Sequence, residues 1–144
     1  MGHTRIGLHE KSLRKFHDRV TETTARKRGR SIQAVVQELN EYLRGWKTYF
    51  DPGLAATTAM ELDHWIRRRL RAYAWKQWKS PRTKVSNLLA RGIGPKWAHM
   101  VGNTRKGPWH LSKNGTLCAA LPDEYFTHTL GLALLGPSRK QPNR

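Results

Sequence analysis

The chain has 144 residues, enough for one domain, and 38% of them are hydrophobic, which suffices for a modest core. Lysine and arginine number 27 against 10 acidic residues, so the formal net charge is +17. No apolar run approaches the roughly 20 residues needed to cross a bilayer, and no secretory signal is apparent, so a membrane partner is not expected. The one cysteine, Cys118, has no second cysteine to pair with, which favours a cytoplasmic location.

The positive charge is concentrated in one part of the chain. From His64 to Pro122 there are thirteen lysines and arginines and no aspartate or glutamate. Self-repulsion on this scale is relieved by a polyanionic partner. Arginine pairs with phosphates while indole stacks on bases, so the arginines and tryptophans of this region predict a nucleic-acid partner.

Two helices are predicted in the first third of the chain. Residues 1–7 are expected to form a flexible start, and the helical spacing of Leu13, Phe16 and Val20 predicts a helix over about 10–26. Charges of both signs cover its outer face, which favours a solvated surface over specific contacts. A short basic loop follows.

The second predicted helix has the most regular apolar pattern. Ser31 is placed to cap it, and nine apolar residues fall within an arc of roughly 140° on an ideal helix. They are Ile32, Val35, Val36, Leu39, Tyr42, Leu43, Trp46, Tyr49 and Phe50. Gly45 lies off this arc, so either RNA or another backbone approaches it closely, or it is a tolerated surface glycine. Asp51, Pro52 and Gly53 end the helix and begin a linker of small residues.

A third helix is predicted from Thr58, which has capping-box spacing with Glu61, to Lys79. The apolar face, expected to be core, consists of Leu62, Trp65, Ile66, Leu70 and Tyr73. The opposite face consists of His64, Arg67, Arg68, Arg71, Trp75 and Trp78. Exposed indoles beside arginines favour contacts with nucleic acid, although either indole could instead pack against the segment after Pro81. Arg69 falls on the apolar side and is expected either to extend its charged end to solvent or to be paired internally, in preference to contacting a ligand.

The rest of the chain is predicted to consist of short elements. Pro81 suits the first turn of a helix that ends at Gly92. Two short extended pieces around an Asn114–Gly115 turn predict a small β-hairpin, and 122–130 is predicted to be a last short helix. Residues 136–144 are expected to be a disordered basic tail. The predicted fold class is mainly α: a helical bundle followed by a short-helix region with a small β-hairpin.

No catalytic centre is apparent. Acidic residues are sparse, and Asp123 and Glu124 are adjacent on a predicted helix, where they diverge and suit its N-terminus better than a Mg²⁺ site. The histidines and the cysteine lack zinc spacing. Cys118 with His110 as its base is less favoured than an ordinary buried cysteine. No metal or cofactor is therefore expected, and no enzyme activity of the chain on its own.

Several motifs, taken in order, resemble a known family. They are RGWKTYF at 44–50, WIRRRLR at 65–71, WKQWK with PRT through 83, and the later Gly107, Trp109 and Ser112. Together they resemble the maturase-specific domain of group II intron reverse transcriptases, over roughly Leu8 to Leu135. The resemblance implies a largely helical, thumb-like domain that binds intron RNA and promotes its splicing.

The resemblance also implies an organisation and a set of contact residues. One domain covers 8–135, with N-terminal helices at 8–53, basic helices at 57–102 and a C-terminal hairpin and short helix at 103–135. The family's motif residues correspond to Arg44, Trp46, Tyr49, Phe50, Trp65, Arg67, Arg68, Arg69, Arg71, Trp75, Trp78, Pro81 and Arg82. The candidate RNA-binding residues are Arg44, Arg67, Arg68, Arg71, Trp75, Lys76, Trp78, Lys79, Arg82 and Lys84.

Complete members of the family carry a polymerase palm with paired aspartates, which this sequence does not contain, so a fragment is expected. The predicted function is an RNA-binding maturase module whose partners are group II intron RNA and a separate fingers-and-palm chain. Leu8, Leu13 and Phe16 are candidates for contact with such a palm. Three alternatives stay open: a thumb of an RNA-directed DNA polymerase whose palm is on another chain, a DNA-binding module with a helix in the major groove, and a nonfunctional remnant.

Overall fold

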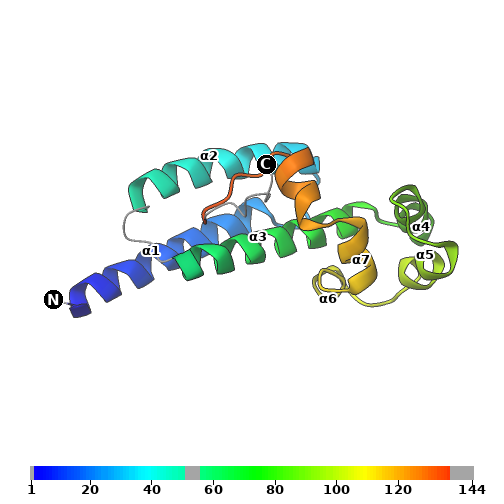
Figure 1. Cartoon of the computed structure of the whole chain (residues 1–144), viewed down its shortest axis with the longest axis horizontal. Helices are drawn as coiled ribbons and strands as arrows, with labels where there is room; N and C mark the ends of the chain where they lie inside the picture. Colours follow the sequence, from blue (N-terminus) through cyan, green and yellow to red (C-terminus); the bar gives the residue numbers. More distant parts are fainter. Residues whose placement is uncertain (1, 51–55, 137–144) are drawn as a thin grey trace, which may run out of the picture.

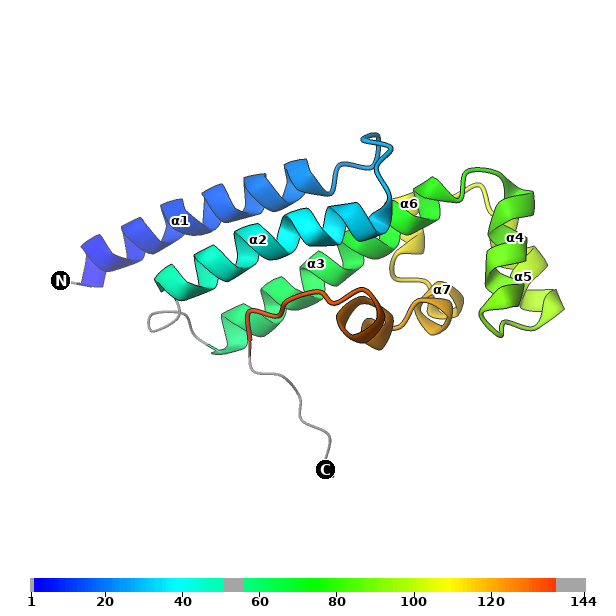
Figure 2. The same ribbon diagram turned by 90° about the horizontal axis from the view of Figure 1, so that it is seen from above.

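Three long helices form the larger part of the fold. The computed structural model describes residues 2–50 and 56–136, and the side chains of 10–47 and 57–136. The long helices are α1 (Gly2–Thr23), α2 (Ile32–Phe50) and α3 (Ala56–Gln77). They lie side by side, with α2 packed against both α1 and α3 (Figure 1, Figure 2). The prediction of a mainly α, bundle-like fold is confirmed.

The core of the bundle uses the apolar positions that helical spacing predicts. Phe16 is fully buried, and its ring centre lies 4.4 Å from that of Trp46. The other buried apolar side chains of α1 to α3 include Val20, Ile32, Val35, Val36, Leu39, Leu43, Ile66, Leu70 and Tyr73. Ser31 Oγ accepts a hydrogen bond from the Ala34 N–H at 3.1 Å, which confirms the predicted cap of α2. The side chains of Tyr49 and Phe50 lie outside the described part of the chain.

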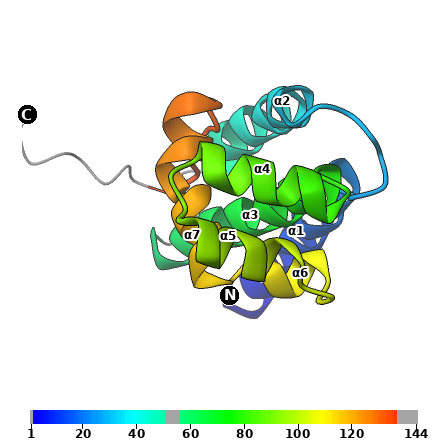
Figure 3. The ribbon, with the colours of Figure 1, turned by 90° about the vertical axis from the view of Figure 1, so that its right-hand side faces the viewer.

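Two shorter helices, α4 (Pro81–Ala90) and α5 (Pro95–Gly102), pack on each other beyond the C-terminal end of α3 (Figure 3). Ser80 Oγ accepts from the Thr83 N–H at 3.2 Å and caps α4. Gly92, with a φ of 89°, ends the same helix in a conformation that glycine adopts without strain. The predicted helix from Pro81 to Gly92 is confirmed.

The α4–α5 contact depends on a glycine. A Cβ atom at Gly102 would lie 2.6 Å from the Cγ2 atom of Val85. Val85 and Gly102 are both buried, as are Ala98 and Val101 on the same side of α5. The absence of a side chain at Gly102 therefore allows α5 to approach α4 closely.

The predicted β-hairpin is wrong, because its two arms are short helices, α6 (Pro108–Leu111) and α7 (Gly115–Ala120). Asn114 Oδ1 accepts from the Leu117 N–H at 3.1 Å, so Asn114 caps α7 and does not form a hairpin turn. An Asn–Gly pair serves either purpose, and the i, i+4 spacing of buried Leu117 and Leu121 decides for the helix. The predicted last helix is also present as a short π-helix, η2 (Tyr125–Thr129), with Phe126 buried.

The chain then runs back along the bundle, where an α2 side chain holds it. Asn40 Nδ2 donates to the Gly131 carbonyl at 2.8 Å, and Asn40 Oδ1 accepts from the Ala133 N–H at 2.7 Å. Figure 2 shows this segment, in orange-red, passing over α3. One buried amide therefore satisfies two backbone groups of an irregular segment.

Asp63 of α3 holds the end of the same segment. Its two carboxylate oxygens accept from the Leu135 and Gly136 N–H groups, both at 2.8 Å. Burial raises the pKa of the Asp63 carboxyl, and these two hydrogen bonds, with Arg67 and Lys47, act in the opposite direction. The C-terminal segment is thus attached to α3 through a buried carboxylate.

Several predicted boundaries differ from those of the structure. α1 begins at Gly2, so residues 2–7, for which a flexible start is predicted, are helical. α3 begins at Ala56, so Thr58 lies within its first turn and the predicted Thr58–Glu61 capping box is not formed. Ala56 and Thr57, which precede Thr58, are already part of the helix. The predicted basic tail lies outside the described residues from 137 onward.

Candidate nucleic-acid interface

The arginine cluster of α3, defined as Arg67, Arg68, Arg69 and Arg71, is attached to other parts of the same chain. Arg68 Nε donates to Ser112 Oγ at 2.8 Å, and Arg68 NH2 donates to the Trp109 carbonyl at 3.1 Å. The guanidinium carbon also lies 3.6 Å from the centre of the Trp109 ring. Arg68 therefore joins α3 to α6 through two hydrogen bonds and a cation–π contact.

Arg71 is buried, with 5% of its surface exposed. Its Nε donates to the Leu121 carbonyl at 2.9 Å, and its NH2 donates to Asp123 Oδ1 at 3.2 Å. Its guanidinium carbon lies 5.3 Å from the centre of the Phe126 ring. A buried guanidinium is tolerated because its donors find acceptors, and here they connect α3 to the segment between α7 and η2.

The two remaining arginines of the cluster also have internal partners. Arg67 Nε lies 3.2 Å from Asp123 Oδ1, an ion-pair distance that lacks hydrogen-bond alignment. Arg69 Nε donates to Thr24 Oγ1 at 2.7 Å, next to the end of α1. Burial lowers the pKa of Arg69, and Arg26 lowers it further. Of the two arrangements predicted for Arg69, internal pairing is the one observed.

These contacts correct the expected solvent-facing surface of α3. Arg71 is buried and Trp75 is fully buried, so both expectations of exposure are wrong. A helical wheel assigns one buried face to each helix, whereas α3 is covered on several sides by α2, α6 and the C-terminal segment. Exchange of Arg67, Arg68 and Arg71 for glutamine is therefore expected to destabilise the fold, whereas three solvent-facing arginines would tolerate the exchange.

The indoles at the end of α3 face cations of α4 and the loop that follows it. Lys84 Nζ lies 4.8 Å from the centre of the Trp75 ring, and Arg91 lies 5.1 Å from that of Trp78. Burial lowers the pKa of Lys84, and nearby Lys76 lowers it further. Trp78 is half-buried against the core. Packing against the segment after Pro81, which the sequence left open, is the observed arrangement.

A smaller group of the candidate residues remains exposed. It consists of Arg44, Lys76, Lys79 and Arg82. Lys76 and Lys79 are at the end of α3, and Arg82 is in the first turn of α4. Three of these cations therefore lie at or beside the turn that connects α3 to α4. Lys79 has a positive φ of 52°, which ends α3 and places this turn at the surface. These side chains can reach phosphates without unfolding the protein.

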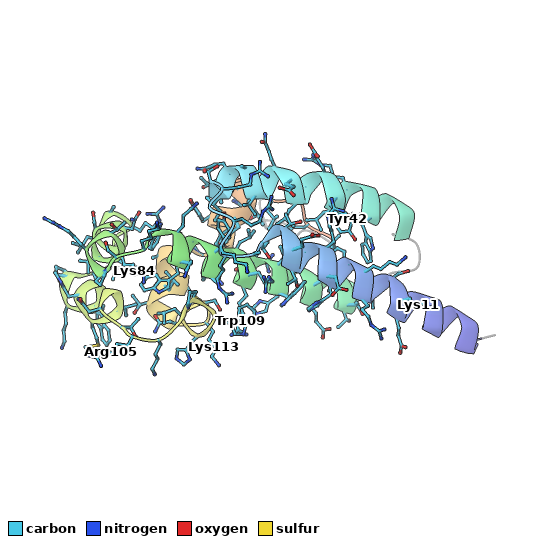
Figure 4. All side chains as sticks on the ribbon, turned by 180° about the vertical axis from the view of Figure 1, so that it is seen from behind. Lys11, Tyr42, Lys84, Arg105, Trp109 and Lys113 are labelled. Atoms are coloured by element: carbon cyan, nitrogen blue, oxygen red, sulfur yellow. The ribbon has the colours of Figure 1, made fainter. Side chains whose placement is uncertain are left out.

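Further exposed cations follow in the region of the short helices. Lys96, Arg105, Lys106 and Lys113 are all exposed. Figure 4 shows Arg105, Trp109 and Lys113 on the same side of the end formed by these helices. The sequence-based list of candidate residues stops at Lys84, although the acid-free stretch to Pro122 indicates that the cationic region extends further.

The described residues contain neither a metal-ligating cluster nor a membrane-spanning helix. Within residues 2–50 and 56–136, no group of three or more His, Cys, Asp or Glu side chains is arranged to hold a metal ion. Across the same residues, no helix combines the length and apolarity that a bilayer span needs. Asp123 is engaged with Arg67 and Arg71. What the arrangement provides is a cationic surface beside packed aromatic side chains.

Comparison with known proteins identifies the family. Residues 13–92 match the family described as group II intron, maturase-specific domain. The matched segment begins within α1, extends beyond the end of α4 and contains all ten candidate RNA-binding residues. Gly107, Trp109 and Ser112 lie outside it. A search of curated proteins gives no match. Because the matched segment covers more than half of the chain, this protein belongs to the group II intron maturase-specific domain family.

Proposed function

We propose that this chain is an RNA-binding maturase module that binds group II intron RNA and assists its splicing. Family membership supports the intron as target. The observation that carries the RNA-binding part is the group of exposed cations at the α3–α4 turn, Lys76, Lys79 and Arg82, within a stretch free of acidic residues from His64 to Pro122. Among the described residues, no carboxylate lies within ion-pair distance of these three cations, and such a group of like charges favours a polyanion over a neutral protein surface.

In this proposal the chain contributes affinity and no covalent chemistry. Exposed lysines and arginines neutralise phosphates. The arginine cluster fixes α6 and the segment before η2 against α3 and so stabilises the structure that carries the exposed cations. Sequence-specific RNA recognition commonly targets unpaired bases in folded RNA. The intron RNA performs the splicing reaction, in a cytoplasmic setting.

A splicing assay tests the proposal. Intron RNA at near-physiological Mg²⁺ is incubated without protein, with this chain, and with this chain plus a fingers-and-palm chain of the same family. We expect RNA binding by this chain alone, and splicing acceleration when the second chain is added, because the RNA must be held at more than one place. Full acceleration by this chain alone would contradict the need for a partner, and no RNA binding would favour a nonfunctional remnant.

The second candidate function is a thumb that completes an RNA-directed DNA polymerase on another chain. The bundle of α1, α2 and α3 within the matched segment favours it. Phe16 is not available for the palm contact, because it is fully buried against Trp46, whereas Leu13 is partly exposed. Primer extension by the palm chain, measured with and without this chain, distinguishes a polymerase thumb from a module that acts in splicing alone.

A further inference from the structure

Trp97 differs from the other tryptophans of the chain. All six lie in the part of the chain whose side chains are described, and Trp97 is the one classed as exposed, with 54% of its surface accessible. The other five have a ring or a cation against them: Trp46 faces Phe16, Trp65 faces His17, Trp75 faces Lys84, Trp78 faces Arg91 and Trp109 faces Arg68. Among the described residues, no ring or cation covers the indole of Trp97.

The position of Trp97 on α5 is fixed by the opposite side of that helix. Ala98 is fully buried and Val101 is 7% exposed, and the close approach of Gly102 to Val85 holds α5 on α4. Met100, three residues after Trp97, is 56% exposed and so shares the outward side. The outward side of α5 is therefore an apolar platform on an anchored helix.

The charges near this platform are positive. Lys96 precedes Trp97 directly, and the loop after α5 carries Arg105 and Lys106. These three side chains are exposed and, among the described residues, have no carboxylate within ion-pair distance. An apolar protein partner leaves such cations without compensation, whereas a nucleotide supplies a flat base for the indole and a phosphate for the cations.

We propose that Trp97 is a stacking platform for an unpaired RNA base, with Lys96, Arg105 and Lys106 neutralising the adjacent phosphates. The proposal rests on the RNA-binding function proposed above and assigns a site beyond the matched segment of 13–92. Met100 widens the apolar surface on which the base lies. A duplex does not suit this site, because its bases are already stacked on one another.

The test compares two RNA probes that carry the same number of phosphates. One is an RNA hairpin with a single-stranded adenine extension, and the other is the same hairpin with an abasic extension of equal length. The wild-type chain is expected to bind the adenine probe about 5- to 150-fold more tightly, the range that corresponds to one stacked base. Trp97→Ala is expected to lose this preference and to keep its affinity for the abasic probe, whereas Trp97→Phe keeps part of the preference.

Met60→Ala is the matched control, because Met60 is an apolar side chain with 48% exposure on a different helix, α3, and its loss should leave the preference unchanged. Circular dichroism establishes that each variant is folded. Equal affinity of the wild-type chain for both probes would overturn the stacking site, as would a preference that Trp97→Ala retains. Failure of the wild-type chain to bind either probe would instead overturn the proposed RNA-binding function, and the site with it.

Discussion

The guanidinium of Arg68 covers the ring of Trp109, with its carbon atom 3.6 Å from the ring centre. The same guanidinium donates to the Trp109 carbonyl and to Ser112 Oγ. One α3 side chain thus fixes both the indole and the backbone of α6. Arg68, which the sequence predicts to bind RNA, therefore connects α3 to α6 within the protein.

Removal of either partner of this contact should destabilise the protein. We expect Arg68→Ala and Trp109→Ala each to lower the free energy of unfolding by about 1 to 3 kcal/mol. In a double-mutant cycle measured by urea unfolding, the two changes should be coupled by about 1 kcal/mol or more. Strictly additive effects would show that the cation–π contact contributes nothing.

Arg71→Gln should have a larger effect, because it leaves the Leu121 carbonyl without its donor inside the protein. We expect a loss of about 2 to 4 kcal/mol in the free energy of unfolding, measured by urea unfolding. Arg82→Gln is the matched control: Arg82 is an exposed cation on α4, so its stability change should stay within about 0.5 kcal/mol. Equal effects of the two substitutions would contradict a structural role for Arg71.

Two glycines should respond in opposite directions to replacement by alanine. Gly102→Ala brings a methyl group to 2.6 Å from Val85 Cγ2 and should destabilise the protein by about 1 to 3 kcal/mol. At Gly45, within α2, a Cβ would meet no described atom within 4 Å, so Gly45→Ala should stabilise the protein by about 0.5 to 1 kcal/mol. Thermal unfolding measures both changes, and Val85→Ala in the Gly102→Ala background should recover part of the loss.

Gly45→Ala also separates the two explanations of that glycine. The structure shows no close approach of another described backbone there, so RNA approach is the functional explanation that stays a prediction. A more stable variant with weaker RNA binding would support contact of RNA with α2 at Gly45. Unchanged RNA affinity, measured by filter binding, would identify an ordinary surface glycine.

Asp63 should make stability depend on pH. Burial raises its pKa in the folded protein, so protonated Asp63 is favoured by folding, and this contribution is present at low pH and is lost as the pH rises through the folded pKa. Asp63→Asn cannot ionise. The unfolding free energy of the wild type minus that of Asp63→Asn should therefore decrease as the pH rises above the ordinary aspartate value. A difference that increases over this range would show that the two N–H bonds outweigh the burial.

Periodicity predicts the long helices well because one side of each faces a common core. Val35, Leu39 and Leu43 recur at helical spacing, and all are buried. Start and stop signals that depend on local geometry, at Ser31, Ser80 and Gly92, are also confirmed, because a cap needs only its own helix.

Predictions fail where a long-range contact decides the outcome. Trp75 and Arg71 cannot be assigned to the interior from α3 alone, since Lys84, Leu121 and Asp123 cover them from later segments. The burial of these two α3 side chains could have been predicted from the apolar residues after position 110, such as Leu117 and Leu121, because those residues need a surface of the bundle to pack against. The exposure of Trp97 could not be predicted, because it follows from how α5 packs on α4. The sequence spacing indicates only that Trp97 and Ala98 point to different sides of the helix.

RNA affinity as a function of salt concentration measures most directly whether the exposed cations carry binding. For the wild-type chain and structured group II intron RNA, the logarithm of the affinity should fall linearly with the logarithm of the salt concentration. In the variant Lys76→Gln, Lys79→Gln, Arg82→Gln, the magnitude of that slope should be smaller by about 2 to 3, one phosphate contact for each charge removed, with the circular-dichroism spectrum unchanged. A flat salt response of the wild type, or an identical slope for the folded variant, would contradict RNA binding by these exposed cations.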